Sequence, residues 1–504
     1  MKKQIYLYFL LTVSLFGCSD FLDIRQEATV PASGLDYSKA ENIFLPVSNA
    51  YAKMRSNNAH GFAYIGAFEI TSDNADKGST PEDNAPMIQL NTFNYEPSND
   101  LINTLWQGYF DIVSAANNAI YQMPLFENAM ESEDNKKYTR ECAAEAKVIR
   151  AYAYFNLTRL FGRIPIVAQL MTAEELAALK QAETPELYSF IKKDLEEAIA
   201  VLPASYSSEW AGRINKYTAM AIKAKVHLYR EEWDSVAYLT DLIIASGKYD
   251  LLSNFREVFS IDGKNCKESL FEIQGSTLGK TTGDPNLTCL EYAYVQGPRG
   301  NSPYNMQGWG FCTPSDNLIQ FFETRGETVR AATTFLYRGT KTPEGDSIKN
   351  SCANPVYNGK VYTPLQYNKW SYNGYGFDQS VRVLRYSDVL LMFAEAKIMN
   401  AVAGNSSGYS ALKAVNQVRD RVGLQLINEE SEEWQENALQ VIWDERRAEL
   451  ALEEDRFFDL VRTGRAAEIL ARKGFVDNKH NVFPIPSIQM KLNLNLEQNP
   501  GYGN

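Results

Sequence analysis

The sequence of 504 residues has few of the side chains on which metal sites and much enzyme chemistry depend. Its three histidines, His60, His227 and His480, form no two-histidine metal motif. HExxH, CxxC and the glycine-rich loop that cradles phosphate are all absent. We therefore expect no catalytic residues, no metal site and no cofactor, although a carboxyl pair of the kind that cleaves glycosides would leave no motif.

The chain is also short of positive charge, with 50 Lys and Arg residues against 62 Asp and Glu residues and a net charge of −12. Nucleic acid and anionic lipid both attract a positive surface, so this balance argues against either as the main partner. Hydrophobic residues make up 45% of the chain and charged residues 22%, which is the composition of a globular protein. Modification of one of the six cysteines would leave an odd number, so we expect no dense disulfide framework.

Residues 1–17 have the features of a signal peptide. Lys2 and Lys3 precede an apolar run, Ile5 to Phe16, that is too short to span a bilayer of about 30 Å. The run ends in Leu15-Phe16-Gly17-Cys18, which resembles the bacterial lipobox, in which the cysteine is acylated after cleavage. Cys18 is therefore the predicted lipidation site, and an export signal that happens to contain a cysteine is the alternative.

Membrane attachment is expected through this lipid anchor only. No later segment approaches about 18 uninterrupted apolar residues, which a membrane-spanning helix would need. The acidic stretch that follows Cys18, Ser19-Asp20-Phe21-Leu22-Asp23, resembles the surface-export signal of Bacteroidetes lipoproteins. The N-terminus therefore predicts a protein tethered to the outer face of a membrane.

Helical periodicity dominates two parts of the mature chain, residues 39–249 and 381–465. Residues 216–229 and 233–246 form the clearest hairpin, because apolar positions recur at helical spacing on both sides of a short turn. Such a turn makes the two helices antiparallel neighbours, as in a tetratricopeptide unit, although no strict repeat runs through the chain. The predicted fold class is mainly α: a tetratricopeptide-like scaffold of helical hairpins with a large loop-rich segment containing a few short strands.

Turn-forming residues gather in two other stretches. Residues 250–380 include GSTLGKTTGDPN, GPRGNSPYNMQGWG and SYNGYGFDQS and show little helical periodicity. Residues 72–100 are rich in Ser, Asp, Asn, Pro and Gly and predict a long loop. The tail from residue 482 has three prolines and predicts no helix. Since binding residues concentrate on loops that a rigid scaffold positions, the first two stretches are the candidate binding regions.

Six segments in order along the chain carry a further signal. They are Cys18-Ser19-Asp20-Phe21-Leu22-Asp23; Trp106-x2-Tyr109-x2-Ile112-x3-Ala116-Asn117; AEAKVIRAYAYFNLTRLFGRIPIV at 144–167; LRYSDVLLMFAEA at 384–396; ERRAELALEEDRFFDLVRTG at 445–464; and FPIP with NLEQNPGY within 483–502. Together they resemble the SusD/RagB family. With this resemblance we expect a signal peptide (1–17), a lipidated tether (18–38) and one SusD-like body (39–504) whose ligand-binding segment is 250–380.

The resemblance implies a function as well as a fold. It implies an outer-membrane lipoprotein that faces the cell exterior, binds a nutrient, chiefly an oligosaccharide, and works with a SusC-like TonB-dependent transporter. It implies binding rather than catalysis. Two alternatives stay open: a helical-repeat lid or scaffold of the transporter that contacts no ligand itself, and a binder of peptides rather than glycans.

Aromatic rings in polar loops are the candidate ligand contacts, because the C–H face of a sugar stacks on a ring while its hydroxyl rim needs polar side chains. In the family, ligand contacts come from loops in about these regions. One candidate group comprises Tyr292, Tyr294, Arg299, Asn301, Tyr304, Asn305 and Trp309. The other comprises Asn74, Asp76, Lys77 and Tyr95. For each aromatic residue, packing in the core is the competing interpretation.

The charged residues of segment 445–464 have a structural interpretation. Glu445, Glu449 and Glu453 lie four residues apart and would repel one another unless arginines intervene. We therefore expect Arg446, Arg447 and their acidic neighbours to form ion pairs that fix Arg456 and the Phe457-Phe458 pair against the body.

Overall fold

Helices account for most of the structure, which confirms the predicted mainly α class. The computed structural model describes residues 34–275, 291–301, 308–367, 378–399, 402–403 and 406–503. Tyr37 to Asn504 clusters as one compact unit. Within the described ranges, no helix combines the length and the apolar character needed to cross a bilayer.

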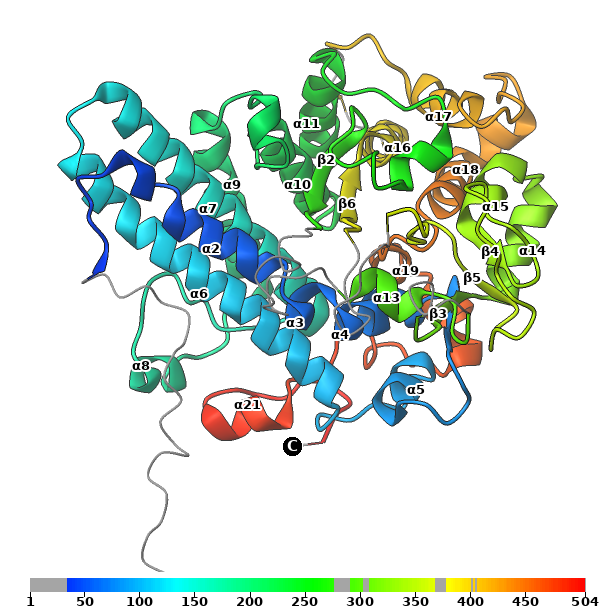
Figure 1. Ribbon diagram of the computed structural model, residues 1–504, viewed down its shortest axis with the longest axis horizontal. Coiled ribbons are helices and arrows are strands. Elements are labelled where there is room, and N and C mark those ends of the chain that lie inside the picture. The colour runs from blue at the N-terminus through cyan, green and yellow to red at the C-terminus, as the bar shows by residue number, and fades with distance from the viewer. Residues whose placement is uncertain are drawn as a thin grey trace, which may run out of the picture. The chain divides into compact units, whose positions relative to one another are not determined.

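The long helices form a series in which each packs against the next (Figure 1). In packing order they are α2 (Leu45–Met54), α6 (Asp100–Ala129), α7 (Glu133–Phe161), α9 (Thr184–Val201), α10 (Lys216–Leu228), α11 (Trp233–Ala245) and α16 (Tyr386–Ile398), which contacts both α17 (Ala411–Asp420) and α18 (Glu432–Glu449). The bounds of α10 and α11 confirm the predicted hairpin. Asn215 starts α10, because its side chain accepts hydrogen bonds from the N–H groups of Tyr217 (2.8 Å) and Thr218 (3.0 Å).

Shorter helices join and cover this series. The α-helical ones are α3 (Asn57–His60), α4 (Phe62–Ile65), α5 (Ala85–Asn91), α8 (Ala173–Ala177), α13 (Tyr292–Gln296), α14 (Asp316–Arg325), α15 (Thr328–Thr334), α19 (Arg456–Arg462), α20 (Ala466–Ile469) and α21 (Ser487–Leu492). The others are the π-helix η5 (Gly66–Ile70) and the 3-10 turns η4 (Ala40–Asn42), η6 (Ser208–Trp210), η7 (Phe255–Phe259) and η9 (Ala471–Lys473).

Three two-stranded antiparallel sheets connect distant parts of the chain. They pair β1 (Ala75–Gly78) with β3 (Phe311–Pro314), β2 (Ser269–Ile273) with β6 (Val381–Arg385), and β4 (Phe335–Tyr337) with β5 (Val356–Asn358). In the first pair, Gly78 lies opposite Phe311 with φ +67°, and a Cβ atom there would lie 2.4 Å from the carbonyl oxygen of Gly310. Only glycine fits this close approach without strain.

Three segments contain helices or strands where the sequence predicted loops or irregular chain. Residues 72–100 contain strand β1 and helix α5, where a long loop was expected. Segment 292–296, also expected as loop, is the short helix α13. The tail contains α21, although its prolines predicted no helix, since Pro486 lies at the N-cap, where a proline does not interrupt helical hydrogen bonding.

The C-terminal tail is bonded to the first long hairpin. The Phe483 N–H donates to the carbonyl oxygen of Leu160 at the end of α7 (2.7 Å), and the side-chain amide of Asn499 donates to that of Phe161 (2.9 Å). The Ser487 N–H donates to the Pro97 carbonyl (2.8 Å), just before α6. The last residues of the chain therefore cover elements made from its first third.

The predicted ion pairs around α18 are confirmed, and they extend further than expected. Arg446 pairs with Asp388 (2.6 Å) and Asp459 (3.2 Å), and Arg456 pairs with Asp73 (2.7 Å). The Phe458 ring lies 4.9 Å from that of Phe68, within the core. The segment therefore has the structural role that its pattern predicted.

A second group of buried charges centres on Arg330 of α15. This fully buried guanidinium donates to Glu327 (2.8 Å) and to Glu449 (3.0 Å), and it also pairs with Glu445. Glu449 is shared with Arg385 (2.9 Å) and Arg421. We call these residues the Arg330 network.

Candidate functional site

The structure brings the two predicted binding stretches together. Strand β1, from the 72–100 stretch, pairs with β3, which follows Trp309. The Arg299 guanidinium spans the two stretches, since it donates to Ser79 Oγ (2.7 Å) and pairs with the carboxylate of Asp83. We call the part of the surface around Arg299, Asp76 and Trp309 the Arg299 edge. It contains the candidate residues that remain partly open to solvent.

Three predicted residues lie at the Arg299 edge. Arg299 and Asp76 have side chains that are 39% and 56% exposed. Trp309 is half-buried, with its ring in edge-to-face contact with Phe62 (5.8 Å) and Tyr294 (5.6 Å). Ligand contact through these three side chains stays a prediction. Tyr304, Asn305 and Cys18 lie outside the described residues.

The other predicted aromatics are packed inside the protein. Tyr292 and Tyr294 are buried in α13, and the Tyr292 hydroxyl donates to Glu454 (2.7 Å). Tyr95 is fully buried, 5.1 Å from the Phe483 ring and 5.4 Å from the His480 ring. These positions offer no open ring face, so the competing interpretation of core packing describes their contacts.

The remaining predicted polar residues form hydrogen bonds within the protein. Asn301 is fully buried, and its side-chain oxygen Oδ1 accepts the N–H of Lys349 (2.9 Å). Asn74 is buried and accepts from Arg447 Nε (2.9 Å). The Lys77 ammonium donates to the carbonyl oxygens of Thr80 (2.7 Å) and Asp83 (3.0 Å). Their contacts shape the loops and leave little polar surface for a ligand.

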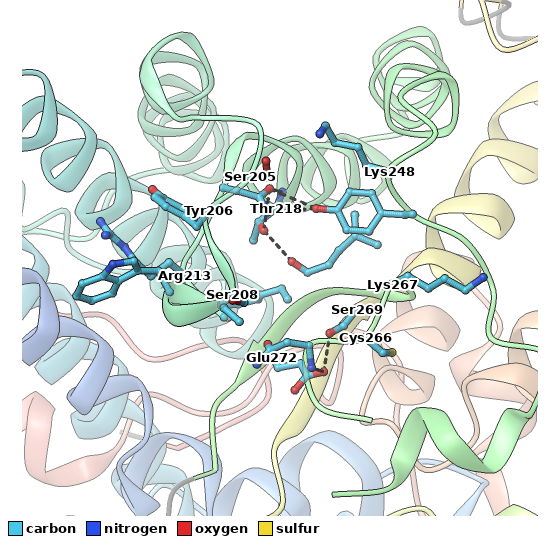
Figure 2. A pocket seen from close by; sticks show the side chains of 18 of the residues that line it. Ser205, Tyr206, Ser208, Arg213, Thr218, Lys248, Cys266, Lys267, Ser269 and Glu272 are labelled. Carbon is cyan, nitrogen blue, oxygen red and sulfur yellow. Dashed lines mark hydrogen bonds between the residues drawn. The ribbon is translucent and has the colours of Figure 1, made fainter. Parts of the chain in front are cut away.

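A cavity that the sequence did not indicate lies between the segment before α10 and strand β2 (Figure 2). Its volume is about 330 Å³, within the range typical of small-ligand sites. Its aromatic lining residues are Tyr206, Trp210, Tyr249 and the buried Phe271. We call it the Trp210 cavity. In Figure 2, Tyr206 and Lys248 border one side, and Ser269 and Glu272 border the opposite side.

Trp210 is the most open aromatic ring of this cavity, with 40% of the residue exposed. It also lines a second cavity, of about 270 Å³, that borders the same segment and shares Arg213 and Glu272 with the first. The one sequence signal was a tryptophan in the polar stretch Ala204-Ser205-Tyr206-Ser207-Ser208-Glu209-Trp210. An aromatic ring in a polar stretch is the same criterion that selected the candidate loops, but those loops did not include this short segment.

Arg213 fixes the position of the segment that contains Tyr206 and Trp210. Its guanidinium lies among four rings, with centroid distances of 4.5 Å to Phe44 and Tyr206 and 5.2 Å to Tyr138 and Trp210. It pairs with the fully buried Glu145, which also accepts from the Tyr206 hydroxyl (3.2 Å). Burial raises the pKa of Glu145, and the hydrogen bond and charge of Arg213 oppose that rise. Cation–π contacts and a buried ion pair therefore fix the aromatic wall.

Two neighbouring carboxyl groups lie in the core beside α13. The Glu454 N–H donates to Glu69 Oε2 (2.8 Å), and both residues are buried. Burial raises the pKa of Glu69 to about 7. Burial, and then the charge of Glu69, raises the pKa of Glu454 well above its usual value. Within the protein, Glu69 also accepts from Ser72, and Glu454 accepts from Tyr292. Glu454 has φ +63°, a strained conformation for a residue with a side chain.

Gly404-Asn405-Ser406-Ser407-Gly408 has the GxSxG spacing of a serine-hydrolase elbow, which sits between a strand and a helix. Here the segment joins α16 to α17, so the structural context differs. The Ser406 and Ser407 N–H groups donate to the Asp241 carboxylate at 2.6 and 3.0 Å, so these two residues are bonded to α11. Among the described residues, no cluster of His, Cys, Asp and Glu is suited to hold a metal ion.

Comparison with known proteins gives two family matches and several SusD-like relatives. Residues 20–228 match the family described as "Starch-binding associating with outer membrane", and residues 333–502 match the "SusD family". A SusD-like protein P2 from Formosa agariphila is 26% identical over 529 residues, which covers 100% of both chains. A SusD-like protein from Bacteroides ovatus is 26% identical over 395 residues, covering 74% of this chain and 67% of that protein.

Solved structures share the fold of this chain. A laminarin-binding SusD-like protein superposes with a TM-score of 0.76 at 25% identity, covering 92% of this chain and 99% of the other. Surface glycan-binding protein A from Bacteroides thetaiotaomicron, in complex with laminarihexaose, has the same fold, with a TM-score of 0.76 at 22% identity over 91% of this chain and 99% of the other. The two family matches, the full-length relative and the shared fold together show that the chain belongs to the SusD family.

Proposed function

We propose that the protein binds oligosaccharides at the cell surface as a lipid-anchored, non-catalytic component of a nutrient-uptake system. The observation that carries this proposal is the likeness to the laminarin-binding SusD-like protein, which spans 92% of the chain at 25% identity. Open aromatic and polar side chains at the Arg299 edge and in the Trp210 cavity supply the chemistry that sugars require.

The anchor and the transporter belong to the same proposal. Cys18 is acylated after removal of residues 1–17, and the lipid holds the body at the outer membrane, in keeping with the description of the matched family. A SusC-like TonB-dependent transporter is the partner that receives the nutrient. Mass spectrometry of the native N-terminus checks the first step, because an unmodified Cys18 thiol contradicts it.

Binding to a panel of hexasaccharides tests the proposal directly. We expect saturable binding of at least one of laminarihexaose, maltohexaose, cellohexaose and xylohexaose in isothermal titration calorimetry. Arg299→Ala should weaken that binding by roughly tenfold to 100-fold, because hydrogen bonds to a charged donor contribute about 1.5–3 kcal/mol. The matched control is Arg256→Ala, which removes another part-exposed arginine, paired with Glu344, and should leave affinity unchanged.

Other outcomes separate the alternatives. Binding of a casein hydrolysate in place of every glycan would identify a peptide binder. Co-purification with a large outer-membrane barrel, with no glycan or peptide bound, would identify a lid that contacts no ligand. Release of reducing sugar from the hexasaccharides by the purified protein would contradict the non-catalytic part of the proposal.

A further inference from the structure

We propose that the Trp210 cavity is a second oligosaccharide-binding site, which takes neutral, hydroxyl-rich sugar units. The proposal rests on the proposed function and adds a location separate from the Arg299 edge. It depends on three features: an open aromatic ring, a buried carboxylate oxygen without a partner, and two adjoining cavities on one segment.

The open ring is Trp210. In the part of the chain that the structure describes, most aromatic side chains are buried, whereas Trp210 is 40% exposed and lines both cavities. Tyr206 and Tyr249, both half-buried, add further aromatic surface to the larger cavity. Because an indole presents a flat apolar face, it stacks on the C–H face of a sugar ring much as aromatic side chains stack on nucleic-acid bases.

Glu272 supplies the second feature. Its side chain is fully buried, and Oε1 accepts from Ser269 Oγ (2.6 Å) and from the Asn265 N–H (3.0 Å). Oε2 has no hydrogen-bond partner among the described residues, although Glu272 lines both cavities. A buried carboxylate oxygen is costly to leave unpaired, so a sugar hydroxyl that reached Glu272 from either cavity would complete its hydrogen bonding.

The surrounding groups favour a neutral ligand with hydroxyl groups. An anionic ligand offers the Glu272 acceptor no proton, and the charge of Glu272 is already matched by Arg382, whose Nε lies 3.8 Å from Oε1. The Arg213 charge is already matched by Glu145, and the Lys267 ammonium is paired with Asp250 (3.0 Å), which leaves Lys248 at the rim as the exposed cation of the lining. The other polar lining consists mainly of hydroxyl and amide side chains, including Ser205, Ser208 and Asn265, which both donate to and accept from sugar hydroxyls.

The two cavities suggest a chain rather than a single sugar. They border the same segment from Trp210 to Arg213, and a sugar chain that passes over Trp210 places units in both. The four rings around Arg213 and its pair with Glu145 hold this segment before any ligand arrives. Such preorganisation lowers the entropic cost of binding.

Hydrogen–deuterium exchange of the full chain tests the second site. The probe is the hexasaccharide of the panel that the wild-type protein binds most tightly, laminarihexaose being the first choice. We expect it to slow exchange in residues 204–215 and 265–274. Trp210→Ala should raise the probe concentration needed for half-maximal protection of these segments by roughly tenfold or more, because one stacking surface is removed. Arg299→Ala should leave this protection in place.

Tyr238→Ala is the matched control, because Tyr238 is a 53% exposed aromatic residue on α11 that lies outside both cavity linings. With the probe bound, this variant should show the same slowing of exchange in residues 204–215 and 265–274 as the wild type. Absence of protection in both segments, in a protein that binds the probe, overturns the second site while the proposed function stands. Failure of the wild type to bind any glycan of the panel overturns both.

Discussion

Replacing Arg330 by alanine is expected to lower the free energy of unfolding by roughly 3–5 kcal/mol. The guanidinium is fully buried and lies among the carboxylates of Glu327, Glu445 and Glu449. Its removal leaves these buried acids with fewer cationic partners and opens a cavity in the core. Urea denaturation followed by far-ultraviolet circular dichroism measures the change.

The matched control for Arg330→Ala is Arg256→Ala. Arg256 also forms a bidentate pair, with both contacts to Glu344 at 2.7 Å, but the two side chains are 22% and 24% exposed. Ion pairs near the surface contribute about 0–1 kcal/mol, so this variant should unfold close to the wild type. Equal losses of stability in the two variants would contradict the role given to burial.

Lowering the pH should reduce the difference in the free energy of unfolding between the wild type and Arg330→Ala. Burial raises the pKa of Glu449, but Arg421, Arg385 and Arg330 outweigh it and hold the pKa well below the usual value of 4.5. A carboxyl whose pKa is lowered by folding stabilises the protein above its unfolded-state pKa, and this contribution is lost as the pH falls toward the folded-state value. The stability difference should therefore shrink below about pH 4.5.

Tyr95→Ala is expected to cost roughly 3–5 kcal/mol of stability, as for other large aromatic residues truncated in a core. The Tyr95 ring is fully buried and contacts the rings of Phe93, Phe483 and Tyr502 at 5.1–6.2 Å. At temperatures where the variant stays folded, its affinity for the probe hexasaccharide should equal that of the wild type. Thermal unfolding and calorimetric titration measure the two properties separately.

Tyr121→Ala is the control for Tyr95, because Tyr121 is 55% exposed on α6 and its loss should change stability by no more than about 0.5 kcal/mol. A Tyr95→Ala variant that keeps the wild-type melting temperature but loses glycan affinity would restore Tyr95 as a ligand contact. The pair of variants thus decides between packing and binding for a residue that sequence could not classify.

The parts of the fold that could be predicted depend on local patterns. The α10–α11 hairpin has apolar positions at helical spacing and a short turn. The acids and arginines of α18 predicted that ion pairs would form, but the partners observed, such as Asp388, Asp73 and Arg330, lie on distant segments that the local pattern does not specify. Local patterns constrain neighbouring residues, which is why the predicted bounds of α10 and α11 were close to those observed.

The candidate sites depended on contacts between distant residues. Tyr95 and Trp210 both lie in polar stretches, yet one ring is buried against the C-terminal tail and the other lies open at a cavity. The walls of the Trp210 cavity come from residues 204–218 and 248–272, and nothing local in either stretch specifies that they face each other. Tertiary packing decides which aromatic rings remain available to a ligand.

The bonds between the C-terminal tail and the end of α7 have a consequence for biosynthesis. A ribosome releases α6 and α7 hundreds of residues before Phe483 and Asn499, which complete their cover. Vectorial folding therefore cannot finish this part of the core while the chain is being made. The nascent polypeptide keeps that surface uncovered until its last residues emerge, which favours binding by chaperones before folding is complete.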